Sequence, residues 1–300
     1  MKSEAAVKQR WWTMTRRESL HGFLFTTPFI IGLIVFFIYP LYISFKLSFG
    51  TLDNIVGMKV SWAGLVNYKE VLARDVEFLP MVGRTFLGIL TNVPLIVVFS
   101  FVIAVMLTKK VKGNWFFRSA FFIPFLLGSG YVMEQLLQQG VNTNVLNLDM
   151  AIIIPQSAIW YLGSDIVTMV NNFLGNVVNL LWRSSVQIIL FISGLHAIPS
   201  SCYEAARVEG ANEWETFWKI TIPMVSPITF LNIVYTIIIS FTDINNEVLQ
   251  YIKGKIFRGS QLNFEYGSAR YWIYTVVIFA VVGIVFAILG RTVKVKGGKQ

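Results

Sequence analysis

Two long apolar runs constrain this chain more than any other feature of its sequence. The runs from Gly22 to Phe45 and from Thr85 to Thr108 each hold 24 residues without a charged side chain. A helix rises about 1.5 Å per residue, so either run can cross the roughly 30 Å hydrocarbon core of a bilayer. Because hydrocarbon offers no partners to backbone polar groups, such runs fold as helices. The chain is therefore predicted to be an all-α, polytopic membrane protein.

The composition agrees with this prediction. Of the 300 residues, 55% are hydrophobic and 14% charged, which leaves too little polar surface for a soluble domain of this size. The net charge of +9 lies mostly beside the apolar runs and not on a compact basic face. Nucleic acid is therefore not an expected partner, whereas the lipid bilayer is.

The remaining apolar segments bring the expected number of membrane spans to six. Beyond the two runs above, the spans are predicted to open near Ser119 and to cover Gly175 to Ile198, Ile220 to Thr242 and Tyr271 to Gly290. Residues 141–174 hold no uninterrupted stretch of membrane length and are interpreted as an external re-entrant or surface segment.

The clustering of basic residues predicts the orientation. An even number of spans places both termini on one face, and the clusters next to the spans favour the cytoplasmic face for the tails. The expected organisation is a basic cytoplasmic tail over 1–20, a six-span transmembrane domain over 21–291 and a cytoplasmic tail over 292–300.

A polar stretch between the fourth and fifth spans carries clear helix signals. Ser201 followed by Glu204 predicts a capping box for a first short helix, and Gly210 predicts its end, since glycine tolerates left-handed dihedral angles. Asn212 followed by Glu215 predicts a second helix start at once.

The second short helix is predicted to be amphipathic. Trp214, Phe217 and Trp218 follow helical spacing and form an apolar stripe, and Pro223 is expected to end or kink the pattern. Two short helices between two spans indicate a docking element on the membrane surface. An ordinary amphipathic loop that rests on headgroups fits the same spacing.

The residues of this stretch resemble a known family. Glu204-Ala205-Ala206, Gly210-Ala211, Ile220, Ile222-Pro223 and Pro227 are similar to the cytoplasmic "EAA" loop of the membrane subunits of ABC importers. The lead-in from Gly194 to Pro199, the segment Tyr39-Pro40-Leu41 and the "GL.NY" signature from Gly64 to Tyr68 resemble the carbohydrate branch of that family.

The resemblance implies a type I importer permease fold and a division of labour between subunits. The loop over 199–223 would be the coupling loop, and its first helix would sit in a groove of an ATP-hydrolysing partner. The implied coupling residues are Glu204, Ala205, Ala206, Gly210 and Ala211. The implied partners are a second, different permease subunit, two ATPase subunits that bind ATP and Mg²⁺, an extracellular solute-binding protein, and a sugar or oligosaccharide. The implied location is a bacterial plasma membrane.

The chain carries no motif for chemistry of its own. It lacks a G-x-x-x-x-G-K-[ST] phosphate loop, and no nucleophile–base pair rises above chance. His21 and His196 have no Cys or carboxylate at ligand spacing, and Cys202 is a lone thiol, so no metal site is expected. The chain is expected not to be an enzyme and to hold no cofactor.

Polar side chains inside the spans are candidates for the solute pathway, because burying them in a membrane is costly unless they face a cavity or another helix. These candidates are Glu134, Gln138 and Gln139 on the third span, Asn179 and Gln187 on the fourth, Asn232 and Tyr235 on the fifth, and Asp243, Asn245 and Asn246 at its outer end. A hydroxyl-rich solute suits such groups. The alternative is that they join helices to one another or to a second permease.

Three other functions remain open from the sequence. The chain could serve an ABC importer of an amino acid or an anion. It could be a secondary transporter or channel that needs no motor. It could also be a membrane scaffold that moves no solute.

Overall fold

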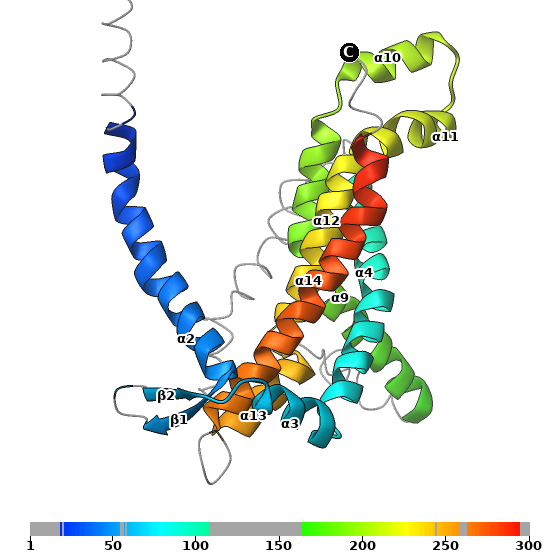
Figure 1. The fold of residues 1–300 in the computed structure, drawn as a ribbon. Helices are drawn as coiled ribbons and strands as arrows, with labels where there is room; N and C mark the ends of the chain where they lie inside the picture. The colour runs from blue at the N-terminus through cyan, green and yellow to red at the C-terminus, as the bar shows by residue number, and fades with distance from the viewer. Residues whose placement is uncertain are drawn as a thin grey trace, which may run out of the picture. The chain divides into compact units, whose positions relative to one another are not determined.

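The computed structural model describes residues 19, 21–54, 57, 59–108, 164–243, 245–257 and 263–294 (Figure 1). The predicted third span, with Glu134, Gln138 and Gln139, lies outside these residues. The chain divides into two compact units, one formed by Met1–Pro80 with Tyr251–Val276 and the other by Met81–Gln250 with Val277–Gln300.

The described residues contain four helices that are long and apolar enough to cross a membrane: His21–Ser48, Phe78–Thr108, Glu213–Phe257 and Phe264–Gly290. They cover the predicted first, second, fifth and sixth spans. A fifth crossing results if Arg183–His196 and Ser200–Val208, which meet at a bend of 60°, count as one span. The all-α membrane class is confirmed, whereas the count of six remains a prediction.

The first unit begins with a helix whose end carries a π-helical turn, η1 (Ile34–Ile38), and then α2 (Tyr39–Ser48). The predicted loop over 50–80 is more ordered than the sequence suggested. It holds a two-stranded antiparallel hairpin of β1 (Gly50–Asn54) and β2 (Lys59–Trp62), followed by α3 (Val66–Arg74). The strands are too short for their alternation to stand out in the sequence.

The "GL.NY" signature fastens this hairpin to α2. The amide of Asn67, which is 1% exposed, donates to the carbonyls of Leu47, Ser48 and Gly50. The Tyr68 hydroxyl donates to Ser48 Oγ at 2.8 Å. Buried backbone carbonyls at a helix end need such partners. The signature is therefore explained by structure within this chain.

The second unit contains most of α4 (Phe78–Thr108), then α9 (Ser164–His196), α10 (Ser200–Val208), α11 (Glu213–Thr216), a π-helical turn η3 (Phe217–Thr221) and α12 (Ile222–Thr242). Two further helices, α13 (Glu247–Phe257) and α14 (Phe264–Lys294), follow. Figure 1 shows α10 and α11 at the end of α9 and α12, so the loop between the fourth and fifth spans closes that end.

The start of one helix differs from the one predicted. Helix α9 begins at Ser164, well before the expected start at Gly175, because the segment between them contains neither proline nor glycine and nothing stops the helix. From Ser164 onward the segment is part of α9, and its external location stays a prediction. Of the two outcomes expected for Pro223, an end or a kink of the helical pattern that begins at α11, the end is not found. Pro223 lies in the first turn of α12, directly after η3, where a missing N–H is tolerated.

Candidate functional site

The first short helix of the polar loop ends as the sequence predicted. The Ala211 N–H donates to the Ala206 carbonyl at 2.9 Å and the Gly210 N–H donates to the Arg207 carbonyl at 3.1 Å. This pair of bonds is a Schellman motif, and it requires a positive φ at the residue after the cap. Gly210 supplies it with φ of +79°. The turn into the second short helix is thus closed by hydrogen bonds within the backbone.

The start of that helix differs from the prediction. Helix α10 begins at Ser200, and its N-cap is Pro199, which makes no side-chain cap hydrogen bond. The predicted capping box of Ser201 and Glu204 is therefore wrong. Pro199 fixes the extended backbone (φ −60°, ψ 136°) from which the helix starts, so Ser201 already lies inside the first turn.

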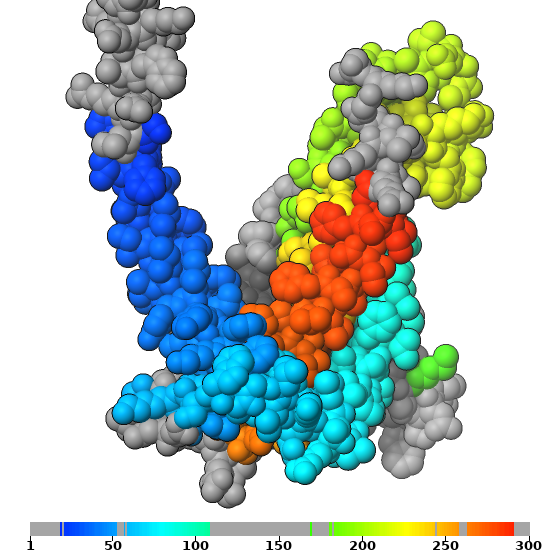
Figure 2. Space-filling view, viewed as in Figure 1, coloured from blue at the N-terminus to red at the C-terminus, as the bar shows by residue number. Residues whose placement is uncertain are grey.

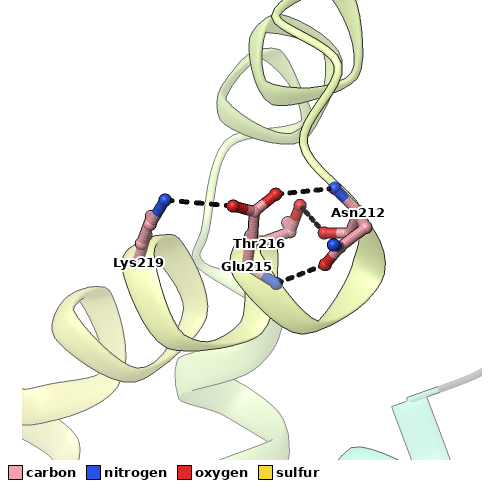
Figure 3. A network of polar contacts seen from close by, with 4 residues as sticks. All are labelled: Asn212, Glu215, Thr216 and Lys219. Carbon is pink, nitrogen blue, oxygen red and sulfur yellow. Dashed lines mark hydrogen bonds and ion pairs between the residues drawn. The ribbon is translucent and has the colours of Figure 1, made fainter.

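The predicted cap of the second short helix is confirmed (Figure 3). The Glu215 N–H donates to Asn212 Oδ1 at 2.8 Å, and the Asn212 N–H donates to Glu215 Oε2 at 3.2 Å. Lys219 Nζ pairs with Glu215 Oε1 at 3.3 Å, four residues along the helix. Together these contacts fix where α11 begins and satisfy backbone donors that would otherwise lack partners.

The implied coupling residues do not all face outward. Glu204 and Ala205 are exposed, as is Gly210, and within the described residues Glu204 makes no hydrogen bond or ion pair. Ala206, however, is 5% exposed, so its methyl group belongs to the packing of this chain and not to a free docking face. Ala211 is half-buried and closes the Schellman turn. The face available to a partner is centred on Glu204 and Ala205.

One hydrogen bond joins the first short helix to the fifth span. The hydroxyls of Tyr203 and Thr221 lie 3.2 Å apart, and Thr221 is the last residue of η3. Thr221 is 7% exposed. Tyr203 immediately precedes Glu204, so displacement of this part of α10 would act on the first turn of α12 through this contact.

Helices α9 and α12 meet along a polar seam. Gln187 Nε2 donates to Thr236 Oγ1 at 3.0 Å, and Arg183 Nη2 lies 3.6 Å from Asp243 Oδ2. At the other end, a Cβ on Gly194 would lie 2.7 Å from Ile228 Cγ1, so glycine is what permits the helices to approach there. Residue numbers rise along one helix as they fall along the other, so the pair is antiparallel.

The predicted solute candidates divide along this seam. Gln187 is 1% exposed and Asn232 is 0% exposed, so neither faces a cavity that opens to the surface of the described chain. Gln187 joins two helices, as the alternative interpretation proposed. The Asn232 amide has no hydrogen-bond partner on either atom among the described groups. Tyr235 is half-buried, and the Asp243 side chain is 30% exposed, so these two are more accessible than Gln187 and Asn232.

Asn246, another candidate, has a structural role. Its Oδ1 accepts from the Val248 N–H at 3.0 Å at the start of α13, and its Nδ2 donates to the Ser240 carbonyl at 3.2 Å. The neighbouring Asn245 donates its backbone N–H to Asp243 Oδ1 at 2.9 Å. The polar residues after the fifth span therefore shape the turn into α13.

The first unit contains a buried ion pair that sequence reasoning missed. Arg270 Nη2 and Nε both lie 2.8 Å from Asp75 Oδ2, and the Tyr251 hydroxyl donates to Asp75 Oδ1 at 2.7 Å. Asp75 Oδ1 also accepts from the Phe78 N–H at the start of α4. Burial alone would raise the pKa of Asp75, but the hydrogen bonds from Tyr251 and Arg270 outweigh it and hold that pKa below its usual value. The sequence signal that could have indicated this pair is that Asp75 and Arg270 each lie next to a predicted span.

Apolar helices of membrane-spanning length, a polar seam between two of them and an exposed two-helix loop define a helical membrane protein with a surface element suited to a partner. No protein-family model matches the chain. It is 30% identical over 296 residues to the probable ABC transporter permease protein YesP of Bacillus subtilis, covering 92% of this chain and 91% of that protein. The chain belongs to the permease subunits of ABC transporters.

Other relatives extend this finding. The chain is 32% identical over 221 residues to the multiple sugar-binding transport system permease protein MsmF of Streptococcus mutans, covering 71% of this chain and 73% of the relative. It is 30% identical over 249 residues to the arabinooligosaccharides transport system permease protein AraP of Bacillus subtilis, covering 79% and 74%.

A solved structure shares the fold. It is a bacterial ABC transporter involved in the import of the acidic polysaccharide alginate, with a TM-score of 0.60 and 16% sequence identity, covering 94% of this chain and 99% of that one. The family expected from the loop residues is thus confirmed. The exact residues that contact an ATPase or a solute stay predictions.

Proposed function

We propose that this chain is one of two permease subunits of an importer for a sugar or oligosaccharide, and that separate ATPase subunits drive it through α10. The observation that carries the proposal is a loop fixed at both turns. The Schellman motif at Gly210 and the capping box at Asn212 hold α10 and α11 in a defined arrangement, with Glu204 and Ala205 exposed. A rigid, exposed element next to a span suits the transfer of force between subunits.

The relatives support the solute class. Two of them are named for transport of sugars or arabinooligosaccharides, and the chain covers more than two thirds of each. Asp243 and Arg183 would line the pathway, because their 3.6 Å pair is partly exposed whereas Gln187 and Thr236 are buried. Carboxylate and guanidinium groups can replace the water contacts of hydroxyl groups.

The remaining features follow from this assignment. The importer lies in the plasma membrane of a bacterium with both tails of this chain in the cytoplasm, and a solute-binding protein delivers solute at the outer face. ATP and Mg²⁺ bind the ATPase partners, so the energy for import enters from outside this chain. The second permease is a different chain.

Gly210→Pro tests the coupling assignment. Proline holds φ near −65°, whereas this position has φ of +79°, so the Schellman turn cannot form. The variant should insert normally but lose copurification with the ATPase. Gly210→Asn is the matched control, since asparagine tolerates the left-handed region and should retain the ATPase. Normal copurification and transport by the proline variant would contradict the proposal.

The solute class is tested in vesicles that contain the assembled transporter. A loaded sugar-binding protein should stimulate ATP hydrolysis, and binding proteins for amino acids or anions should not. Stimulation by one of the latter would assign a different solute class. Uptake that persists without any ATPase subunit would instead show a secondary transporter.

A further inference from the structure

Two large aromatic side chains stand exposed on α11 and η3, in the second half of the loop over 199–223. Trp214 is 69% exposed and Trp218 is 51% exposed, and their rings lie 5.6 Å apart in an edge-to-face arrangement. Figure 2 shows the segment projecting at the end of the second unit. An exposed aromatic pair of this size on a short helix marks an interaction surface.

The Phe217 ring contacts both tryptophans and connects them to the rest of the helices. The Phe217 ring lies 5.5 Å from the Trp218 ring and 6.5 Å from the Trp214 ring. Phe217 also contacts Phe101 of α4 at 6.0 Å, and Phe101 contacts Phe191 of α9, which is fully buried, at 5.2 Å. A continuous series of ring contacts therefore connects the two tryptophans to the helix core, and their outer faces remain uncovered by the described residues.

The continuity of the helix limits how far the pair can lie from the membrane. Segments α11, η3 and α12 follow one another without a break from Glu213 to Thr242. At about 1.5 Å per residue, Trp218 lies no more than ~6 Å and Trp214 no more than ~12 Å beyond the first residue of α12. Each headgroup layer is roughly 5–8 Å thick. Because the fifth span is predicted to begin at Ile220, the aromatic pair falls at the boundary between the hydrocarbon and the water, or just outside it.

The chemistry of the segment fits that boundary. An indole ring has an apolar body and one polar N–H, and tryptophan is enriched where a span meets the headgroups. The charged residues Glu215 and Lys219 each follow a tryptophan by one position, so they lie on the adjacent face of the helix. The Lys219 side chain is 74% exposed and can reach a lipid phosphate.

We propose that Trp214 and Trp218 form a lipid anchor that seats α11 in the headgroup layer of the bilayer. The anchor sets the distance between the loop and the bilayer surface. Helix α10, which precedes the Gly210 turn, then projects beyond that surface. The proposal rests on the insertion of α12 in the membrane. It does not depend on which solute is carried, on the ATPase assignment or on the orientation of the chain.

Fluorescence quenching in liposomes tests the anchor. The assembled transporter is reconstituted with phospholipids brominated at the headgroup end of the acyl chains, or is exposed to acrylamide in the water. Subtracting the emission of the Trp214→Phe/Trp218→Phe variant from that of the wild type isolates the pair. The brominated lipid should quench this difference emission, and acrylamide should quench it little.

Free N-acetyltryptophanamide in the water outside the liposomes is the control for the two quenchers. Acrylamide should quench it strongly, and the brominated lipid should quench it little. Emission of the pair that only acrylamide quenches would overturn the anchor and place the pair in water. Emission that neither quencher reaches would overturn it in favour of a protein partner. Each single variant repeats the test if the double variant does not assemble.

Discussion

Adding one methyl group at Gly194 should separate the fourth and fifth spans next to the coupling loop. A Cβ at this position would lie 2.7 Å from Ile228 Cγ1 and 3.1 Å from both Ile228 Cβ and Cγ2. Ordinary contact begins near 3.4 Å, so the helices would have to move apart by about 0.7 Å. Ile228 is branched at Cβ and cannot rotate all of these atoms away. Gly194→Ala should therefore destabilise the protein by about 1–3 kcal/mol, as overpacking does.

The assay is thermal unfolding of the purified transporter together with the ATP hydrolysis that a loaded binding protein stimulates. The melting temperature and the rate of stimulated ATP hydrolysis should both decrease in Gly194→Ala. The double variant Gly194→Ala/Ile228→Ala should recover part of each loss, because Ile228→Ala removes the atoms that clash. Contacting residues of this kind show non-additive effects of about 0.5–3 kcal/mol. Gly88→Ala on α4 is the matched control. A Cβ there has nothing within 4 Å, and it should be neutral or slightly stabilising.

Strictly additive effects at Gly194 and Ile228 would refute the reasoning, as would a neutral Gly194→Ala. Either result would mean that α9 and α12 do not approach each other at this point in the working transporter. The role assigned to the Tyr203–Thr221 contact would then also lose its support, since both contacts lie at the same end of the helix pair.

Three further predictions follow from single contacts. Asn212→Ala should speed amide hydrogen exchange in α11 because the Glu215 N–H loses its acceptor, and Asn212→Ser should restore protection; unchanged exchange in the alanine variant would contradict the capping role. The pKa of Asp75 is lower in the folded state than its unfolded value of 3.8, so the ionised carboxylate stabilises the folded protein at pH values above 3.8. That stabilisation is lost as the pH falls further, so the melting temperature of the wild type should decrease once the pH is below about 4. Asp75→Asn should lower the melting temperature at neutral pH and flatten that drop, and an equally steep drop would refute the assignment. Gln187→Leu should change stability by no more than about 1 kcal/mol and leave solute affinity unchanged, because the side chain is buried between helices; a weakened affinity, measured by solute binding, would return it to the pathway.

The sequence by itself determined what depends on a few neighbouring residues. The four described helices of membrane-spanning length follow from contiguous apolar runs. The end of α10 at Gly210 and the Asn212–Glu215 capping box are set by interactions within about five positions of one another, and all of these features were predictable. The family was likewise predictable, since its loop residues are contiguous. The Ser201 cap failed because an equally local competitor, the extended backbone of Pro199, starts the helix two residues earlier.

The tertiary structure decided which distant polar groups meet. Arg270 and Asp75 form their ion pair although they are 195 positions apart in the sequence, and Gln187 and Thr236 form their hydrogen bond across 49 positions. No local spacing in the sequence specifies either pair. The same holds for the burial of Ala206, whose exposure depends on what packs against one face of a short helix. Backbone propensities act over one turn of helix, whereas these pairings depend on how whole helices pack. The sequence could therefore name the polar candidates, but it could not separate those that join helices from those accessible to solute.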